Sequence, residues 1–404
     1  MTYGIEGRLS LEVDPGRILT SHGYVPEVPD IRQAVRNALQ RPLDFPPVEQ
    51  AIVPGDRITI ALDRHTPCGA EIIAEVWDLF SHRGISPEDI YILQPVSMDR
   101  RRLSDPRSQL PENVRSLVRW GIHDPTDKAR QAFLANTSTG ERVYLAREVV
   151  DADFVFPIGV MQYDPVLGIS GTSSVFFPGM STVDAISKAR GEGHWELSPE
   201  DDRPLRQMMD EIGWLLGTQV TLQVVSSSGA GVAEVLVGTP DAVAQAGRQA
   251  LAGHWKIEQD QHADMVVVAV DADTAGHGWQ QIGQALETAQ HLVSRRGKII
   301  VLSELEEEPG EGLKLLTGRR KASEALRALR KQAPPDLVST SQLVHAVDWA
   351  RVYFMSHLPA EVVEEMFLVP VETEREVSRL LAGQGTVSFV ASAQHTFGQV
   401  GSRV

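Results

Sequence analysis

The chain has 404 residues, a formal net charge of −16 and a pI near 5.2. This length exceeds what one hydrophobic core usually supports, so two domains are expected. The acidic balance argues against a nucleic-acid-binding surface, because phosphate binding needs clustered lysine and arginine. The only basic cluster of the sequence, GRRKASEALRALRKQ (Gly318–Gln332), has the spacing of the exposed face of a helix.

The sequence also bears on the compartment of the protein. Its one cysteine, Cys68, allows no disulfide within the chain, which fits a reducing environment. The first residues, MTYGIEGRLSLEVD, lack the apolar core of a signal peptide. No apolar run approaches the roughly 20 residues that a membrane helix needs. We therefore expect a cytoplasmic protein that binds neither membranes nor nucleic acids.

The first half of the chain predicts strands that alternate with helices. After a proline-rich start with one helix (IRQAVRNALQ), the run RITIAL predicts a buried strand, and a helix over Glu71–His82 follows and stops at Gly84. IYILQPVS (Ile90–Ser97) and VVDADFVFPIGV predict two more strands, and STVDAISKA predicts a helix. Such alternation is typical of a mostly parallel sheet. The polar segment GEGHWELSPEDDRP predicts a surface excursion.

The second half predicts a hairpin and then a second α/β unit. TQVTLQVVSSSGAGVAEVLVGTP predicts two strands around the turn Ser226–Gly231, and DAVAQAGRQALAGHW predicts a helix. ADMVVVAVDAD and QQIGQALETAQHLVSRRGKIIVLSEL predict a parallel strand–helix–strand crossover. PPDLVSTSQ, RVYFMSHLP and TVSFVASAQ predict further short strands. The fold class is therefore α/β with two domains, 1–253 and 254–404, each a mostly parallel sheet flanked by helices, with a cleft between them.

Polar residues follow the predicted strand ITIAL directly. Asp63, His65 and Thr66 would lie at its carboxyl end, the edge where open α/β sheets bind ligands. The following helix N-terminus favours an anion. The alternative is that Asp63 or Thr66 only caps that helix, with Pro67 as its first residue. The spacing leaves both interpretations open.

Two further polar sets have simpler explanations. A metal site at His123, Asp124 and Asp127 is only weakly indicated. One histidine and two aspartates bind a metal only if their side chains converge, and their spacing does not show that they do. A capped helix start is the preferred interpretation there. Tyr163 and Asp164 end the strand DFVFPIGVM and either face a ligand or are solvated.

The glycine-rich stretch GISGTSSVFFPG (Gly168–Gly179) follows the same strand. A loop of this kind lets backbone N–H groups cradle a phosphate. No lysine or histidine occurs between Asp153 and Ala185, so the loop lacks the lysine of a nucleotide-binding P-loop. GISGTSS also lacks the order of a nucleophile elbow. No strand is followed by G-x-G-x-x-G, which disfavours an NAD(P) oxidoreductase.

The order of these segments resembles the lactate racemase family, the nickel-dependent 2-hydroxyacid racemases and epimerases, from about Tyr3 to Phe397. GDRITIALDRHTPCGAEII is similar to the family's strand and D-x-T-R-P loop. STGERVYLAREVVDADFVFPIGVM and GISGTSSVFFPGMSTVDAI are similar to its T-x-x-G-x-P-V-x-V-N segment and its glycine loop. ADMVVVAV and the QQIGQALETAQ helix are similar to its second domain. The resemblance implies the fold of that family.

The resemblance also implies an activity: racemisation of a 2-hydroxy acid through a nickel pincer nucleotide that takes a hydride from Cα and returns it. In the family, two histidines exchange the hydroxyl proton, a loop lysine holds the cofactor covalently, and a third histidine binds nickel. The resemblance aligns the family's loop aspartate with Asp63 and the arginine of the same loop with Thr66. It aligns the first catalytic histidine with the region around Pro95, the second catalytic histidine with Asp164 or a neighbour of it, and the cofactor lysine with Ser174. The nickel-binding histidine falls near Arg190, with His194 as a shifted substitute, and the second-domain glutamine and lysine fall on Gln281 and Gln284.

These replacements remove the family's chemistry. Serine cannot form the lysine amide link, proline cannot accept a proton, and arginine cannot ligate nickel near neutral pH. Asp164 can act as a base, but with an ordinary pKa near 4 it would be a poor acid at pH 7. The glycine loop is then an inherited cofactor cradle whose reactive side chains have been replaced.

Two hypotheses follow. In the first, the chain is a divergent family member that binds a small anion (a 2-hydroxy acid, sugar acid or nucleotide) in the cleft, any activity being of the racemase or epimerase type. Its expected residues are, for catalysis, Asp164 and Tyr163; for the ligand or cofactor, Asp63, Thr66, Ser170, Gly171, Ser174 and Gln281; and for a metal, His194. In the second, the chain is a non-catalytic binding or accessory member, a pseudoenzyme.

Overall fold

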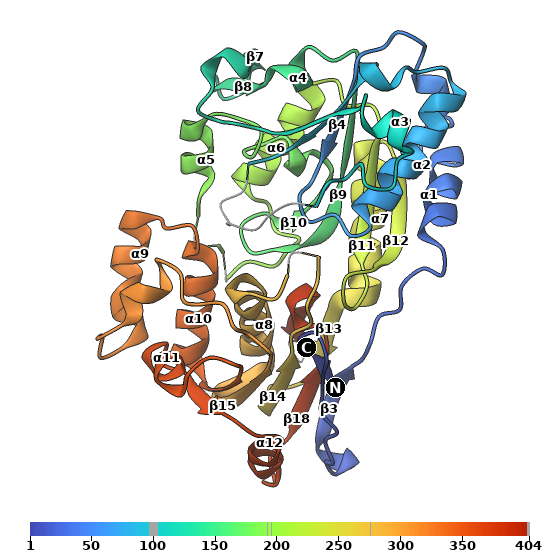
Figure 1. The fold of residues 1–404 in the computed structure, drawn as a ribbon. Helices are drawn as coiled ribbons and strands as arrows, with labels where there is room; N and C mark the ends of the chain where they lie inside the picture. The colour runs from blue at the N-terminus through green and yellow to red at the C-terminus, as the bar shows by residue number, and fades with distance from the viewer. Residues whose placement is uncertain (97–103, 192, 195, 275, 402–404) are drawn as a thin grey trace. The chain divides into compact units, whose positions relative to one another are not determined.

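The computed structural model describes residues 1–96, 104–191, 193–194, 196–274 and 276–401 (Figure 1). The chain divides into two compact units, each with its own sheet. We call Pro26–Arg190 with Pro199–Leu251 the N-terminal unit, and Met1–Val25 with Gly191–Ser198 and Ala252–Val404 the C-terminal unit. The mixed α/β architecture with mostly parallel sheets confirms the predicted fold class.

The N-terminal unit contains a seven-stranded sheet. Neighbouring strands run parallel, except that β12 and the short β10 pair antiparallel with β11 and β9. The order across the sheet is β12 (Val232–Gly238), β11 (Thr221–Ser226), β9 (Phe154–Asp164), β4 (Ile58–Leu62), β5 (Ile90–Gln94) and β6 (Arg119–Ile122), with β10 (Gly168–Ser170) beside β9.

Both faces of this sheet are covered, which explains its continuous apolar strands. Ile58, Ile60 and Leu62 of β4 pack into one core with the first two helices, whereas Ala61 joins a second core on the other face. The helices of the unit are α1 (Ile31–Gln40), α2 (Gly69–His82), α3 (Glu112–Arg115), α4 (Arg147–Val150), α5 (Val183–Ala189), α6 (Pro204–Leu215) and most of α7 (Pro240–Trp255). A separate hairpin pairs β7 (Gln131–Asn136) with β8 (Arg142–Ala146).

The C-terminal unit contains a six-stranded sheet in which all neighbours are parallel. Its order is β17 (Val369–Val371), β16 (Arg351–Met355), β15 (Val293–Leu302), β14 (Ala263–Ala269), β18 (Val387–Val390) and β3 (Ile18–His22). The helices are α8 (Trp279–Leu292), α9 (Leu326–Gln332), α10 (Leu337–Trp349), α11 (Ala360–Glu365) and α12 (Glu374–Leu381). A small parallel pair joins β13 (Lys256–Gln259) to β19 (Phe397–Val400).

Most predicted elements are confirmed, and one is wrong. The hairpin around Ser226–Gly231 and the β14–α8–β15 crossover form as expected. Only the last part of the basic cluster forms α9, in which Leu329 is buried while Arg330 and Lys331 are exposed; a 3₁₀ turn over Ala322–Ala325 precedes it. PPDLVSTSQ, predicted as a strand, instead begins helix α10. Its small polar side chains are buried because α10 packs closely along α8, which a periodicity of two does not reveal.

The structural division differs from the predicted domains 1–253 and 254–404 at the N-terminal end. The units change at Leu251–Ala252, but Met1–Val25 belong to the C-terminal unit. The reason is strand pairing, because β3 forms the edge of the C-terminal sheet against β18. No single sequence window contains both strands. Among the described residues, no helix is long and apolar enough to cross a membrane.

Candidate functional site

The carboxyl edge of the N-terminal sheet brings several predicted residues together. Strand order reverses at β4, because β5 and β6 follow on one side and β9 and β11 lie on the other. This reversal is the place where open α/β sheets form a ligand-binding crevice. β4 ends just before Asp63, and β9 continues past it to Asp164 before the glycine loop begins.

The structure does not support the capping alternative for Asp63 and Thr66. Asp63 donates its backbone N–H to the Ile158 carbonyl at 2.8 Å, and the Thr66 hydroxyl donates to the Asp63 carbonyl at 3.0 Å. Helix α2 begins at Gly69, and its N-cap is Cys68, in a left-handed conformation (φ 53°) without a side-chain hydrogen bond. A Cβ placed on Gly69 would meet no atom within 4 Å. The first turn of α2 therefore has no side-chain cap and adjoins open space.

The metal alternative at His123 gains no support from the geometry. His123 is buried, its Nε2 lies 2.8 Å from the Ser181 carbonyl, and burial lowers its pKa. Asp127 accepts from the Ala129 N–H and caps a short 3₁₀ turn, as the capping interpretation predicted. Asp124 accepts from the N–H and hydroxyl of Thr126. Both aspartates thus serve local turns.

Tyr163 and Asp164 lie where β9 turns into β10. Asp164 accepts from the N–H groups of Val166 and Leu167 at 2.8 and 2.7 Å, so its carboxylate closes this turn. Burial raises the pKa of Asp164, and the two N–H donors oppose that rise. The assumption of an ordinary pKa is therefore wrong, because the Asp164 carboxyl keeps its proton to a higher pH than the sequence suggested. Burial likewise raises the pKa of Tyr163.

Ser174 and Gly171 hold the glycine loop in a closed form. The Gly171 N–H donates to Ser174 Oγ at 2.9 Å, and the Ser174 N–H donates to the Gly171 carbonyl at 3.1 Å. Gly171 has φ of 117°, and a Cβ there would lie 2.3 Å from Met161 Sδ and 3.2 Å from Gln223 Oε1. The serine at the predicted lysine position thus has a structural role. Ser170, the last residue of β10, pairs with Gln162.

Arg206 of α6 was not predicted, yet it contacts this loop at three points. Its Nη1 donates to the Ile169 and Gly171 carbonyls at 2.9 and 3.2 Å, and its Nη2 donates to Thr172 Oγ1 at 2.8 Å. Asp210 pairs with the same guanidinium at 2.8 Å. The sequence carries no signal for this contact, because the loop and helix α6 are separated by a polar excursion.

Pro95, the predicted position of a family histidine, lies against the same loop. The Val96 N–H donates to the Gly179 carbonyl at 3.0 Å, and a Cβ on Gly179 would lie 2.5 Å from Pro95 Cβ. The structure therefore brings the ends of β4, β5 and β9 to one sheet edge. The predicted strand end at Ser97 lies outside the described residues.

The residues present do not fit a covalent nickel pincer nucleotide. Ser174 Oγ cannot replace an amine, and it is already used within the loop. His194 belongs to the C-terminal unit, is 46% exposed and lies 3.8 Å from Glu196. Within the part of the chain that the structure describes, no group of three His, Cys, Asp or Glu residues is arranged to hold a metal ion. We derive no chemical step through nickel.

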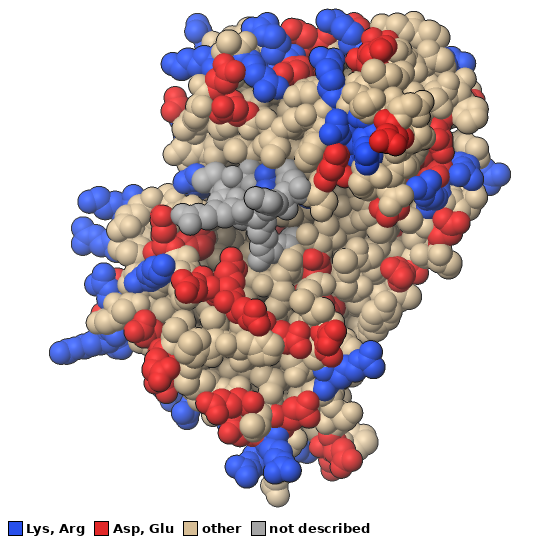
Figure 2. Space-filling model, in the orientation of Figure 1, with Lys and Arg blue, Asp and Glu red and all other residues tan. Residues whose placement is uncertain are grey.

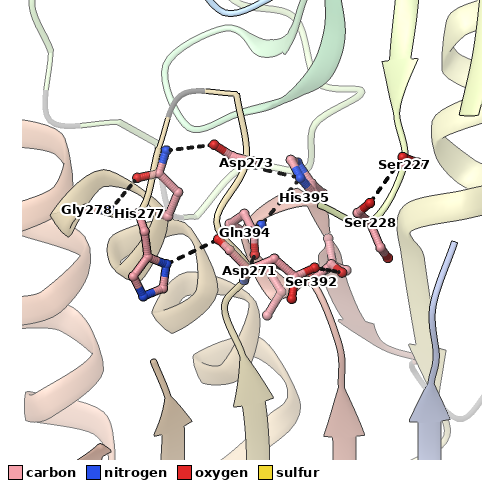
Figure 3. A network of polar contacts seen from close by, with 12 residues as sticks. Ser227, Ser228, Asp271, Asp273, His277, Gly278, Ser392, Gln394 and His395 are labelled. Carbon is pink, nitrogen blue, oxygen red and sulfur yellow. Dashed lines mark hydrogen bonds and ion pairs between the residues drawn. The ribbon is translucent and has the colours of Figure 1, made fainter. Parts of the chain in front are cut away.

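The C-terminal sheet has its own polar edge, shown in Figure 3. Gln281, predicted from the sequence, is buried at the start of α8, where its Oε1 accepts from the Gly278 N–H at 3.0 Å and its Nε2 lies 3.5 Å from Asp273 Oδ1. Sequence reasoning missed its neighbours, which follow β14 and β18: Asp271, Asp273, Ser392, Gln394 and His395. The carboxyl-end rule applied to ADMVVVAVDAD and TVSFVASAQH would have found them.

Comparisons with known proteins fit this geometry. Residues 4–192 match the family model of the lactate racemase N-terminal domain. The whole chain also has the fold of the lactate racemase apoprotein from Thermoanaerobacterium thermosaccharolyticum, with a TM-score of 0.82, 14% identity, and 98% of this chain and 99% of that chain covered.

A structural-genomics protein from Thermotoga maritima is also similar, with a TM-score of 0.67, 12% identity, and 93% of this chain and 100% of that chain covered. A search of the curated proteins found no match. The lactate racemase-like architecture therefore extends over the chain as a fold, whereas the family match covers the stretch that contains β4, β5, β9 and the glycine loop.

Proposed function

We propose that this lactate racemase-like protein binds a small anionic ligand, a 2-hydroxy acid, a sugar acid or a nucleotide, at the carboxyl edge of the N-terminal sheet, and that it does so without the covalent nickel pincer nucleotide. The observation that carries the proposal is the open first turn of α2 beside the end of β4. A 14-residue helix without a side-chain cap presents unpaired N–H groups and the positive end of its dipole.

The surroundings of this turn favour an anion of limited size. Gly69 leaves room where any other residue would place a Cβ, and Cys68 and Thr66 flank it. Glu71 is the acidic residue of the first turn and already supplies one negative charge there. An anion must therefore compete with Glu71, which predicts a moderate affinity that rises when this charge is removed.

Any catalysis at this edge would depend on Asp164 and Tyr163. The raised pKa of Asp164 brings its carboxyl group closer to the range in which it can both take up and release a proton. Asp164 also accepts two backbone hydrogen bonds, so a proton transfer would loosen the β9–β10 turn. Isomerisation of a hydroxy acid is the activity that the family resemblance suggests for such a pair.

The alternative function, a non-catalytic binding or accessory protein, has its own support. Ser174 Oγ is an acceptor within the glycine loop, and Pro95 replaces a proton-transfer residue beside Gly179. A binding protein derived from an enzyme would retain such a loop, which lacks reactive side chains and forms hydrogen bonds within itself. In this alternative the protein binds the anion but does not catalyse a reaction.

Calorimetric titration of the purified protein with D-lactate, L-lactate, gluconate and AMP tests the binding. We expect at least one of these anions to bind, Gly69→Leu to weaken that binding at least tenfold, and Glu71→Gln to strengthen it. Gly253→Leu is the matched control, because a Cβ on this second helical glycine also meets no atom within 4 Å. The proposal fails if none of the four anions binds, or if Gly69→Leu and Gly253→Leu behave alike.

Activity and metal content separate the two functions. Chiral chromatography after incubation with each lactate enantiomer measures racemisation, and elemental analysis measures nickel in the protein as purified. Turnover that Asp164→Asn abolishes supports the isomerase. Binding without turnover supports the accessory protein. Stoichiometric nickel in a covalent adduct would contradict the argument from Ser174.

A further inference from the structure

The N-terminal unit contains a pocket that none of the residues predicted from the sequence lines. Its volume is about 550 Å³, which is in the range of pockets that hold small organic ligands. The hairpin β7–β8 and the segment before it form one wall, the segment from Phe177 through α5 forms a second wall, and Met208 of α6 also lines it. The pocket shares no residue with the first turn of α2, so it does not depend on the anion site proposed above.

Hydrogen bonds hold the walls of this pocket in place. The hydroxyl of Ser181, a buried residue of the second wall, donates to the Tyr144 carbonyl of β8 at 2.6 Å. At the start of β7, Gln131 Nε2 donates to the Pro125 carbonyl at 2.7 Å, which fastens the segment before the hairpin. All four residues line the pocket. A ligand would therefore not have to order these segments when it binds.

The lining of the pocket includes an apolar set that we call the floor, formed by Val143, Phe177 and Met208. Val143 and Phe177 are buried and belong to one hydrophobic core, against which Met208 packs. Val183 also lines the pocket but is 48% exposed. A ligand with an apolar body would remove its own surface and that of Val183 from water, which favours binding.

The charged lining of the pocket is positive overall. Lys128, Arg142 and Lys188 line it together with Glu141 and Asp184, which leaves one positive charge in excess. Lys188 and Glu141 pair at 3.6 Å. Within the part of the chain that the structure describes, the side chains of Lys128 and Arg142 have no acidic partner. In a chain with a net charge of −16, unpaired cations at a pocket favour an anionic ligand.

The surface around the hairpin carries further cations. In Figure 2, lysine and arginine side chains gather over β7, β8 and α4, with acidic side chains among them. On the drawn face of the C-terminal unit, acidic side chains predominate in the same figure. Two arginines near the hairpin, Arg130 and Arg147, pair with carboxylates at 2.5 and 3.6 Å. These pairs distinguish them from Lys128 and Arg142, whose charges stay available to a ligand.

The two unpaired cations lie at opposite ends of the hairpin. Lys128 precedes β7, whose first residue Gln131 pairs with Ala146, whereas Arg142 pairs with Asn136 at the other end. These ends are roughly 17 Å apart along the strand, so a small carboxylate pairs closely with only one of the two cations. A guanidinium binds a carboxylate through two parallel hydrogen bonds, whereas an ammonium acts as a point charge. We therefore expect the carboxylate at Arg142.

We propose that the pocket between the β7–β8 hairpin and α5 binds an apolar monocarboxylate, whose carboxylate pairs with Arg142 and whose hydrocarbon body packs on the floor. The excess of one positive charge in the lining matches one carboxylate. A dicarboxylate or a phosphate ester carries more negative charge than this excess. A polyol would cover the floor with hydroxyl groups that lose their hydrogen bonds to water.

Calorimetric titration of the full chain tests this pocket. The probes are trans-cinnamate and octanoate, the amides of the same two acids are the uncharged comparisons, and acetate is the anion without an apolar body. We expect at least one probe to bind, and its amide and acetate to bind at least tenfold more weakly. Arg142→Gln should weaken the probe's affinity at least tenfold. Lys128→Gln should weaken it no more than threefold, because the carboxylate lies at the other end of the hairpin.

Arg41→Gln is the matched control, because Arg41 is an exposed arginine of the same unit that does not line the pocket. Thermal unfolding checks that each variant is folded, and Arg142→Lys, which loses the two parallel hydrogen bonds, replaces Arg142→Gln if the latter is not. The proposal is overturned if neither probe binds, if the amides bind as tightly as the acids, or if Arg142→Gln and Arg41→Gln behave alike. It is equally overturned if Gly69→Leu abolishes binding while Arg142→Gln does not, because the probe would then occupy the first turn of α2.

Discussion

The two sheet edges share a topology and differ in how their polar groups are used. In the N-terminal unit, the loop after β9 is closed by Ser174 and clamped by Arg206, with contacts of 2.8 to 3.2 Å. In the C-terminal unit, the buried His395 has its nearest polar partners at 3.4 and 3.8 Å. The comparison teaches that strand order selects the place where polar groups gather, whereas the loops after the strands decide how closely these groups approach one another.

The largest expected effect tests the rigidity of the glycine loop. Gly171→Ala places a Cβ 2.3 Å from Met161 Sδ at φ 117°, and steric overlap plus backbone strain should lower the free energy of unfolding by about 4 kcal/mol. Gly140→Ala is the control, because Gly140 also has a positive φ (83°) but open space around it. Urea denaturation measures both. Equal losses would show that the loop is not tightly packed.

The next effect tests the burial of His395 through the dependence of stability on pH. The native pKa of His395 is about 4, below the ordinary 6.5, so the unfolded chain takes up this proton first as the pH falls. Stability should be retained above pH 6.5 and lost as the pH falls to about 4, by up to about 3 kcal/mol from this group. Urea denaturation of wild type and His395→Gln measures two free energies of unfolding, and their difference gives the contribution of His395. A difference that does not change with pH would contradict the burial of a neutral imidazole.

A smaller effect tests the clamp. Arg206→Ala removes hydrogen bonds from a charged donor to the Ile169 and Gly171 carbonyls, which should cost about 2 kcal/mol of folding free energy. Amide hydrogen exchange should then rise in the glycine loop while staying unchanged in the C-terminal unit. Arg57→Ala, which breaks an exposed pair with Asp153, should leave loop exchange as in wild type. If loop exchange does not rise in Arg206→Ala, the loop does not depend on the clamp.

The smallest effect concerns Asp164. Burial raises its native pKa above the ordinary 3.8, so ionisation costs stability as the pH rises through that native pKa. Asn keeps an oxygen for the N–H groups of Val166 and Leu167 and carries no charge. Asp164→Asn should therefore raise Tm by about 2 °C at pH 7 and by nothing at pH 3. Calorimetry that shows a lower Tm at pH 7 would mean that the nearby arginines outweigh the burial.

Local signals sufficed to predict much of the fold. IRQAVRNALQ carries a helical stripe and ITIAL a continuous apolar run, and the structure has α1 and β4 at these residues. The sequence predicted Asp63, Asp164 and Ser174 as ligand-binding residues, and this role stays a prediction; the structure has the ends of β4 and β9 at one edge of the N-terminal sheet. PPDLVSTSQ failed because its polar residues are buried by α8, a partner far away in the chain.

The sequence by itself determined the α/β class, the loop replacements such as Ser174 and Pro95, and the resemblance to lactate racemases, because these depend on residue identity and on periodicity within short windows. Only the tertiary structure decided that β3 completes the C-terminal sheet, that Arg206 clamps the glycine loop, and that His395 faces Asp273 across 3.8 Å. Each of these contacts joins residues more than 30 positions apart. Their energies arise from burial and geometry, which no local pattern encodes.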